Sequence, residues 1–190
     1  LAQTPNDSTW CDFIVAQREV VITAQRHPLY NFALPLVTTV VSKETLQKRP
    51  PRTVPEALEG AAGVFLQKTN HGGGSPFLRG LTGQQTLLLV DGIRINNATF
   101  RSGPNQYLNT IDPSWMERIE VLESSGAAEY GSDAIGGVVN VITHSLSFSD
   151  TKVINPELAY KWISGGMENS GQAALTASRQ RWAVRAGAAY

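Results

Sequence analysis

The chain has 190 residues, and its sixteen Lys and Arg residues balance sixteen Asp and Glu residues, so no net charge draws it toward nucleic acid or an anionic lipid surface. This length fits one or two domains with a hydrophobic core. Cys11 is the only cysteine, which excludes an intrachain disulfide and a multi-cysteine zinc site.

The first 35 residues read as an N-terminal arm. Residues 1–19 lack sustained periodicity, which is typical of a loose segment. Residues 20–24 form a short β-prone island in polar surroundings: Val20, Val21, Ile22, Thr23 and Ala24. The pattern fits an edge strand of the following domain and equally a strand that pairs with an open sheet edge on a partner.

The next elements are short and well punctuated. Residues 36–41 predict a β-branched strand, and Ser42 begins a short helix that ends at Pro50-Pro51. Thr53 and Glu56 predict a capping box for a helix that stops at residues 60–63. A strand is expected over 64–68, and the glycine-rich residues 69–75 are expected to be a loop.

Strands and turns alternate from residue 77 to residue 143. We expect strands over 77–79, 86–90, 93–95, 118–122 and 138–143. Asp91-Gly92 predicts a hairpin turn, and Asp112 followed by Pro113 predicts the start of a one-turn helix. Residues 96–110 read as a polar loop, and Gly131, Gly136 and Gly137 bracket a tight corner.

The pattern changes after His144. Strands are expected over 157–163, 172–178 and 181–190, separated by turns that include Asn169-Ser170-Gly171. In the last strand Trp182, Val184 and alternate residues to Tyr190 share one face, and Arg181 and Arg185 share the other. This period fits a membrane β-barrel strand and also a half-buried strand of a soluble sheet.

The sequence offers no pattern for an enzyme. Residues 131–137 lack the Lys-Ser/Thr pair of a phosphate-binding loop, and there is no GxSxG or HExxH motif. His27, His71 and His144 lie far apart in sequence, near no evident ligand set. We therefore expect no catalytic residues, no metal site and no cofactor.

Four motifs in this order resemble the plug domain of TonB-dependent outer-membrane receptors. They are LRG at 78–80, LLLVDGIRIN at 87–96, ERIEV at 117–121 and YGSDAIGGVVNVIT at 130–143. The resemblance covers residues 19–143. One departure is Ser124-Ser125-Gly126, which stands where the family usually has Gly-Pro and is expected to loosen the turn after Glu123.

The resemblance implies an α+β plug domain, a small mixed β-sheet with short flanking helices, followed by the first antiparallel strands of a transmembrane β-barrel. The expected organisation is an arm over 1–35 with a TonB-box-like strand at 20–24, a plug over 36–146, and about three barrel strands over 147–190. The remainder of the barrel is expected to lie outside this sequence.

The implied function is the gate of an active transporter in the outer membrane of a Gram-negative-type bacterium. It would import a scarce nutrient, such as an iron–siderophore complex, haem or a cobalamin-like ligand. The plug would sit inside the barrel lumen with its arm in the periplasm. The implied partners are TonB with its proton-driven inner-membrane motor, the barrel of the same receptor, the membrane through that barrel, and a metal-chelate ligand; nucleic acid is not expected.

Site residues follow from the same resemblance. TonB is expected to bind Val20, Val21, Ile22, Thr23 and Ala24. Apical loops are expected to present to the ligand Asn70, His71, Ser75, Phe100, Arg101, Asn105 and Tyr107. The plug–barrel interface is expected to use Arg79, Arg118, Glu117 and Glu120. His71 also raises the hypothesis of a haem ligand, although a loop histidine without a ligand is the simpler interpretation.

Two other functions fit the pattern. A plug-like interaction module could serve a secretion or signalling assembly without nutrient uptake. A soluble periplasmic ligand-binding protein is a weaker alternative, because its last strands would be unpaired edges prone to aggregation.

Overall fold

The computed structural model describes residues 20–21, 29–30, 36–70, 72–95, 103–104, 106–163 and 168–190. The chain divides into two compact units, Leu1–Thr143 and His144–Tyr190. Each unit is described by itself below.

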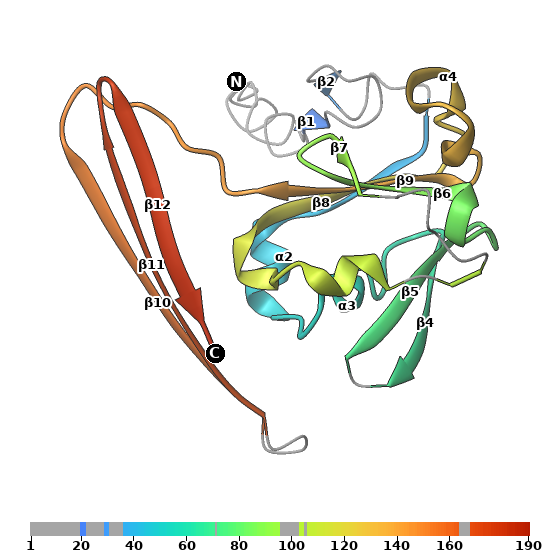
Figure 1. Cartoon of the computed structure of the whole chain (residues 1–190), viewed down its shortest axis with the longest axis horizontal. Helices are drawn as coiled ribbons and strands as arrows, with labels where there is room; N and C mark the ends of the chain where they lie inside the picture. The colour runs from blue at the N-terminus through green and yellow to red at the C-terminus, as the bar shows by residue number, and fades with distance from the viewer. Residues whose placement is uncertain are drawn as a thin grey trace, which may run out of the picture. The chain divides into compact units, whose positions relative to one another are not determined.

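The centre of the first unit is a mixed sheet, in which five described strands have the order β3-β8-β9-β6-β7 (Figure 1). These strands are β3 (Thr38–Val41), β6 (Thr86–Val90), β7 (Ile93–Arg94), β8 (Met116–Leu122) and β9 (Gly137–Thr143). β6 and β9 run parallel, and the other neighbours are antiparallel. The predicted mixed sheet is confirmed, and the strand expected over 86–90 has those bounds.

Two further strand pairs belong to the first unit. β1 (Val20–Val21) pairs antiparallel with β2 (Leu29–Tyr30). β4 (Val64–Asn70) and β5 (Gly73–Leu78) form a hairpin that extends away from the five-stranded sheet (Figure 1). The prediction that residues 69–75 form a loop is wrong for its described part, because Gly74 pairs with Lys68 across the hairpin. Glycine fits at position 74 because an added Cβ would lie only 2.9 Å from Pro55 Cβ.

The helices are short. In the described residues, the α-helices are α2 (Lys43–Lys48), α3 (Val54–Ala57) and α4 (Ala127–Tyr130), and the 3-10 turns are η2 (Gly83–Gln85), η3 (Tyr107–Thr110), η4 (Pro113–Trp115) and η5 (Ser132–Ala134). Ser42 caps α2, and the Asp112 side chain accepts a hydrogen bond from Ser114 N–H at 2.8 Å, as predicted.

Helix α3 ends earlier than predicted. Thr53 occupies the N-cap position without a side-chain cap hydrogen bond, and Glu56 instead accepts from the N–H of Arg52 at 2.7 Å. The N–H of Leu58 bonds to the carbonyl of Pro55, which tightens the last turn to a 3-10 geometry. The predicted capping box is therefore not formed, and one α-helical turn remains.

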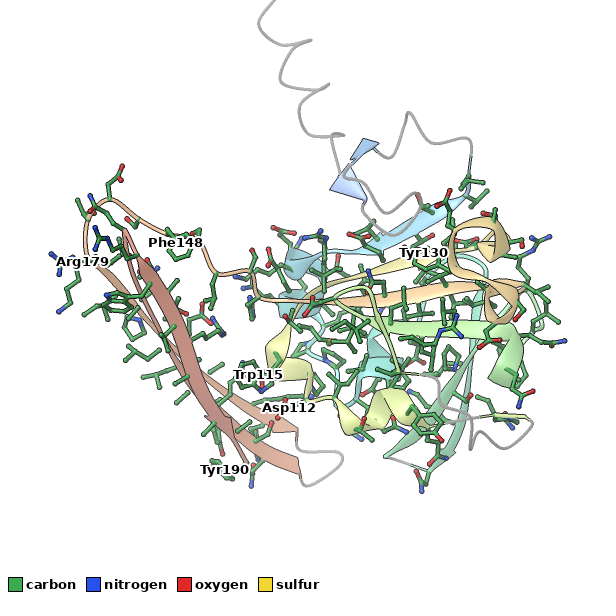
Figure 2. All side chains as sticks on the ribbon, turned by 45° about the horizontal axis from the view of Figure 1, so that its top comes forward. Asp112, Trp115, Tyr130, Phe148, Arg179 and Tyr190 are labelled. Carbon is green, nitrogen blue, oxygen red and sulfur yellow. The ribbon has the colours of Figure 1, made fainter. Side chains whose placement is uncertain are left out.

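The sheet has a core on each face. The larger core gathers residues of β8 and β9 with α3 and η3: Val41, Val54, Leu58, Leu78, Leu88, Leu108, Met116, Ile119, Val121, Val139 and Val141. The smaller core lies beneath α4 and η5, where Tyr130 is buried with Leu87, Leu89, Leu122, Ala134 and Val138 (Figure 2). Successive residues of β8 point to opposite faces, so Val121 joins one core and Leu122 the other.

Gly136 and Gly137 allow β9 to begin where neighbouring residues leave no room for a Cβ atom. A Cβ on Gly136 would lie 2.8 Å from Leu81 Cβ, and one on Gly137 would lie 2.4 Å from the carbonyl oxygen of Leu122. Before the corner, the N–H of Gly126 bonds to the carbonyl of Ala134 at 2.9 Å. This hydrogen bond joins the two ends of the segment that holds α4 and η5, directly after Ser124-Ser125.

The second unit is an antiparallel meander of β10 (Val153–Ile163), β11 (Glu168–Arg179) and β12 (Trp182–Ala189). The predicted turn at Asn169-Ser170-Gly171 is wrong, since Gly171 lies inside β11 opposite Tyr160. None of the helices in the described residues is long and apolar enough to cross a membrane.

Candidate functional site

The LRG motif forms a tight turn at the end of the β4–β5 hairpin. Leu78 and Leu81 exchange two backbone hydrogen bonds of 2.9 Å, and both residues between them have positive φ, 52° for Arg79 and 84° for Gly80. These values correspond to a type I′ turn. The turn places the Arg79 guanidinium 3.4 Å from the carbonyl oxygen of Glu123, at the end of β8.

The side chain of Glu123 fills the space left by a glycine. Its carboxylate is nearly buried and accepts a hydrogen bond from Thr39 Oγ1. A Cβ on Gly63 would lie 2.4 Å from Glu123 Oε2, and Gly63 has a φ of +64°. Gly63, Thr39 and Glu123 therefore join the start of β4 to the edge of the central sheet.

A buried ion pair lies on β8. Arg118 Nε donates to Glu120 Oε1 at 2.9 Å, and the Glu120 side chain is 0% exposed. Glu120 is the register partner of Val40 on one side and Asn140 on the other. Glu120 is therefore not on the surface of this unit, unlike the more accessible Arg79, Glu117 and Arg118.

The VDG turn is fixed by two side chains of β9. Asp91 and Gly92 have φ values of 50° and 79°, and the N–H of Gly92 donates to Asn140 Oδ1 at 3.1 Å. Asp91 accepts hydrogen bonds from the N–H and the hydroxyl of Thr143. The turn was predicted from Asp91-Gly92, but these contacts were missed, because Asp91 alone signals only turn geometry.

Arg94, in β7 of this hairpin, links the hairpin to the glycine corner. Arg94 Nη1 lies 2.7 Å from Asp133 Oδ2, and Arg94 Nη2 donates to the carbonyl of Tyr130 at 2.8 Å. The two motifs that carry these residues, VDGIR and YGSD, are therefore in contact through one guanidinium. Sequence reasoning missed this contact as well, since the two motifs are far apart in the chain.

The β4–β5 hairpin carries an aromatic pair and a charged cluster. Phe65 and Phe77 are register partners whose rings meet edge to face at 6.0 Å, and Phe65 is 67% exposed. Lys68 Nζ lies 2.8 Å from Glu59 and 3.3 Å from Glu56.

The charged cluster shifts two pKa values. Burial opposes ionisation of Glu56, but hydrogen bonds from the Arg52 N–H and from Lys68 outweigh it and lower the pKa of Glu56. The hydrogen bond to Glu59, reinforced by Glu56, raises the pKa of Lys68. The charge of Lys68 is thus already matched within the first unit.

The predicted ligand residues are only partly described. Asn70 ends β4 and its Oδ1 accepts from the N–H of Gly72 at 3.1 Å. Tyr107 is partly buried against the larger core. Ser75 is 3% exposed, and its hydroxyl lies 3.4 Å from Thr82 Oγ1, so it is not on the surface of this unit. His71, Phe100, Arg101 and Asn105 lie outside the described residues.

The predicted partner-binding strand is described at two positions. Val20 and Val21 are extended in β1, opposite Tyr30 and Leu29. Ile22, Thr23 and Ala24 lie outside the described residues. The described parts of the chain contain no group of three or more His, Cys, Asp or Glu residues that could hold a metal ion.

Comparison with protein families and curated proteins gives consistent matches. The model of the TonB-dependent receptor plug domain matches residues 31–138. Among curated proteins, the vitamin B12 transporter BtuB of Vibrio vulnificus is 38% identical over 138 residues, which are 72% of this chain and 22% of the transporter. BtuB of Photobacterium profundum is 36% identical over 127 residues, 65% of this chain and 20% of that protein. The chain spans about a fifth of the length of these relatives.

Solved structures share the fold. The alcaligin outer-membrane receptor FauA of Bordetella pertussis has a TM-score of 0.68 at 18% identity, covering 90% of this chain and 29% of the receptor. The siderophore receptor PirA of Acinetobacter baumannii has a TM-score of 0.58 at 28% identity, covering 80% of this chain and 24% of the receptor. These similarities agree with the mixed sheet and flanking helices described above.

Proposed function

Because the chain belongs to the family of TonB-dependent receptor plug domains, we propose that it is the gate of an active importer that carries a cobalamin-like ligand across the outer membrane. The observation that carries this proposal is the 38% identity to a vitamin B12 transporter over 138 residues. The siderophore receptors share the fold, so an iron complex is the second ligand class to test. The relatives are named as transporters and receptors, which gives no support to an enzymatic role.

The faces of the second unit support the barrel part of the proposal. Ile154, Leu158, Tyr160 and Trp162 lie on one face of β10, and their exposed fractions range from 50% to 84%. The opposite face is polar, where Arg185 Nη2 lies 2.7 Å from Glu157 and Nη1 lies 3.1 Å from Thr176 Oγ1. An apolar outer face with a polar inner face is what a transmembrane barrel strand requires.

Aromatic residues lie at both ends of this apolar face. Tyr160, Trp162 and Tyr190 lie at one end of the sheet, and Trp182 lies at the other end of β12. The ring of Tyr190 covers Gly171, where an added Cβ would lie 2.7 Å from Tyr190 Cε1. Aromatic residues at both ends are typical of strands that meet two membrane interfaces.

The arm supports coupling to TonB. Val20 and Val21 are extended in β1, paired with β2, and an extended backbone is the conformation that strand addition to a partner sheet requires. The arm enters the plug at β3, an edge strand that pairs only with β8 among the described strands. A pull on the arm therefore acts on the hydrogen bonds between residues 38–41 and β8, which can open one after another.

The gate also needs contact with a barrel wall. Arg79, Glu117 and Arg118 are the remaining candidates for this contact, since Glu120 is enclosed within the first unit. Arg118 already pairs with Glu120, so a wall carboxylate would extend an existing ion pair. A pair of this kind is weak evidence for stability, but it can set the register between the two surfaces.

Uptake of radiolabelled cyanocobalamin by cells that express the full-length receptor tests the proposal. We expect Val21→Pro to abolish energy-dependent uptake while surface binding of cyanocobalamin is retained, because proline removes a backbone donor needed for strand addition. Val21→Thr is the matched control, since it keeps the N–H and the β-branched shape.

Two results would contradict the proposal. A receptor that binds neither cyanocobalamin nor ferric siderophores would refute the importer function and favour a plug-like interaction module. Equal uptake by the proline variant and its control would refute the role of β1 in coupling. The intact mass of the native polypeptide from outer membranes would show whether a covalent barrel accompanies the plug.

A further inference from the structure

Glu123 holds the beginning of β3, the strand through which the arm enters the central sheet. Glu123 lies directly after β8, and its N–H donates to the carbonyl of Val37 at 3.0 Å. Its carboxylate accepts a hydrogen bond from the hydroxyl of Thr39. Both the backbone and the side chain of Glu123 therefore bond to the first residues that a pull on the arm would reach.

The same residue also contacts the base of the β4–β5 hairpin. Arg79 Nη1 lies 3.4 Å from the carbonyl oxygen of Glu123, and the N–H of Arg79 donates to the carbonyl of Gly63 at 3.2 Å. The Glu123 carboxylate lies beside Gly63, where an added Cβ would be 2.4 Å from Oε2. Glu123 thus connects β3 with a hairpin that belongs to a separate sheet.

β3 is held less firmly than the strand at the other end of the first unit. It has four residues and pairs with β8 alone among the described strands. β9 pairs with both β8 and β6, and its last residue, Thr143, is also held by Asp91. A pull between residues 36 and 143 would therefore separate β3 first, because β3 has only one neighbouring strand to leave.

Separation of β3 would disturb the side chain of Glu123. Glu123 is only 9% exposed, and the Thr39 hydroxyl bonds to its carboxylate. A nearly buried carboxylate that loses a hydrogen-bond donor is costly unless it reaches water. When β3 leaves, the carboxylate should therefore turn toward solvent and vacate the space beside Gly63.

The hairpin base is easily loosened once Glu123 moves. Arg79 has a φ of 52°, a left-handed conformation that is unfavourable for a residue with a side chain. The contact with the Glu123 carbonyl and the hydrogen bond to Gly63 restrain Arg79 in this conformation. Movement of Glu123 removes one of these restraints and leaves the other at a strained turn.

We propose that Glu123 is a positioning residue that couples β3 to the base of the β4–β5 hairpin, so that a pull on the arm loosens the hairpin as well. The pull rests on the proposed function, whereas the coupling is a property of the first unit itself. β4 ends at Asn70, one of the predicted ligand residues. The coupling would therefore carry a pull on the arm to the strand that bears this residue.

Hydrogen exchange in the full-length receptor tests the coupling. Thr39→Val removes the hydroxyl that bonds to Glu123, and Thr143→Val is the matched control, because it removes a hydroxyl that bonds to Asp91 at the opposite end of the sheet. In Thr39→Val the amide of Glu123 should exchange about tenfold faster and that of Arg79 about threefold faster. In Thr143→Val both amides should keep their wild-type rates.

The reverse direction provides a second pair of variants, since coupling between two sites is reciprocal. Gly63→Ala forces the Glu123 carboxylate aside, so it should speed exchange of the Glu123 amide at the β3 side. Gly60→Ala is its control, because Gly60 also has a positive φ, 89°, but an added Cβ would lie no closer than 3.9 Å to a neighbour. The Glu123 amide should be unaffected by Gly60→Ala.

The amide of Ile95, which bonds to β6, serves as a reference within the same unit. Exchange that quickens equally at Glu123, Arg79 and Ile95 would indicate a general loss of stability and overturn the coupling. An Arg79 amide that keeps its wild-type rate in Thr39→Val, or an equal effect of Thr143→Val, would overturn it too.

This experiment needs neither a ligand nor TonB. A receptor that takes up no cyanocobalamin would therefore refute the proposed function without changing the exchange result, and unchanged exchange at Arg79 would refute the coupling while the importer function stands.

Discussion

Asp91 holds the last residue of the first unit, Thr143, by both its backbone and its side chain. The Thr143 N–H donates to Asp91 Oδ1 at 2.9 Å, and its hydroxyl donates to Oδ2 at 2.7 Å. The second unit begins at the next residue, His144. The turn between β6 and β7 therefore fixes the point where the chain leaves the central sheet.

We expect Asp91→Ala to destabilise the first unit by about 1–2 kcal/mol, because it removes two hydrogen bonds and leaves an alanine at positive φ. Asp91→Asn should cost less, since asparagine tolerates this conformation and keeps one acceptor oxygen. Urea denaturation followed by tryptophan fluorescence measures both. Thr143→Val and the double variant complete the test. If the double variant loses as much free energy of unfolding as the two single variants lose together, Asp91 and Thr143 are not coupled.

Gly63→Ala should be more destabilising than Gly80→Ala. Both glycines have positive φ, 64° and 84°, but only the Cβ at Gly63 would meet a neighbour, at 2.4 Å from Glu123 Oε2. Backbone strain of about 1 kcal/mol is common to both variants, and the clash adds to it only at Gly63. Thermal melting of the two variants gives the difference, and equal melting temperatures would show that Glu123 moves aside freely.

Leu158→Arg and Ala159→Arg test the two faces of β10. Leu158 is 84% exposed on the apolar face, and Ala159 lies on the opposite face. If the apolar face meets lipid, arginine at Leu158 should cost about 2–4 kcal/mol near the bilayer midplane, whereas arginine at Ala159 should be tolerated. The yield of folded receptor in outer membranes checks this, and equal yields would contradict a lipid-facing surface.

The charged cluster around Lys68 predicts a pH dependence. The pKa of Glu56 is lowered in the folded state, so its stabilising contribution is present above the unfolded glutamate pKa of about 4.3 and is lost as the pH falls through the lower folded value. The raised pKa of Lys68 gives a stabilising contribution that is fully present below the ordinary lysine pKa of about 10.4 and is lost as the pH rises through the higher folded value.

The stability difference between wild type and Glu56→Gln should therefore be constant near neutral pH and shrink in acid. Because the pair is partly exposed, the difference should stay below about 1 kcal/mol. Urea titrations at several pH values measure it. A difference that grows on acidification would contradict the assigned hydrogen bonds.

Local signals in the sequence predicted the elements that depend on neighbouring residues. β6 at 86–90, the Asp91-Gly92 turn and the Asp112 cap follow from side-chain size, backbone preference and short-range hydrogen bonding. The two-residue period of β12 likewise places Trp182 and Val184 on one face. The mixed sheet and the plug family also followed from the order of four motifs.

Only the tertiary structure decided which residues the elements bring together. Asn169-Ser170-Gly171 reads as a turn, yet pairing with β10 and cover by Tyr190 keep Gly171 inside a strand. Ser75 and Glu120 read as accessible polar residues, but both are buried by packing and long-range pairing. Asp91 and Thr143 form hydrogen bonds although they are 52 positions apart in the sequence. Such contacts depend on strand register and on the close approach of distant segments, which local residue preferences do not determine.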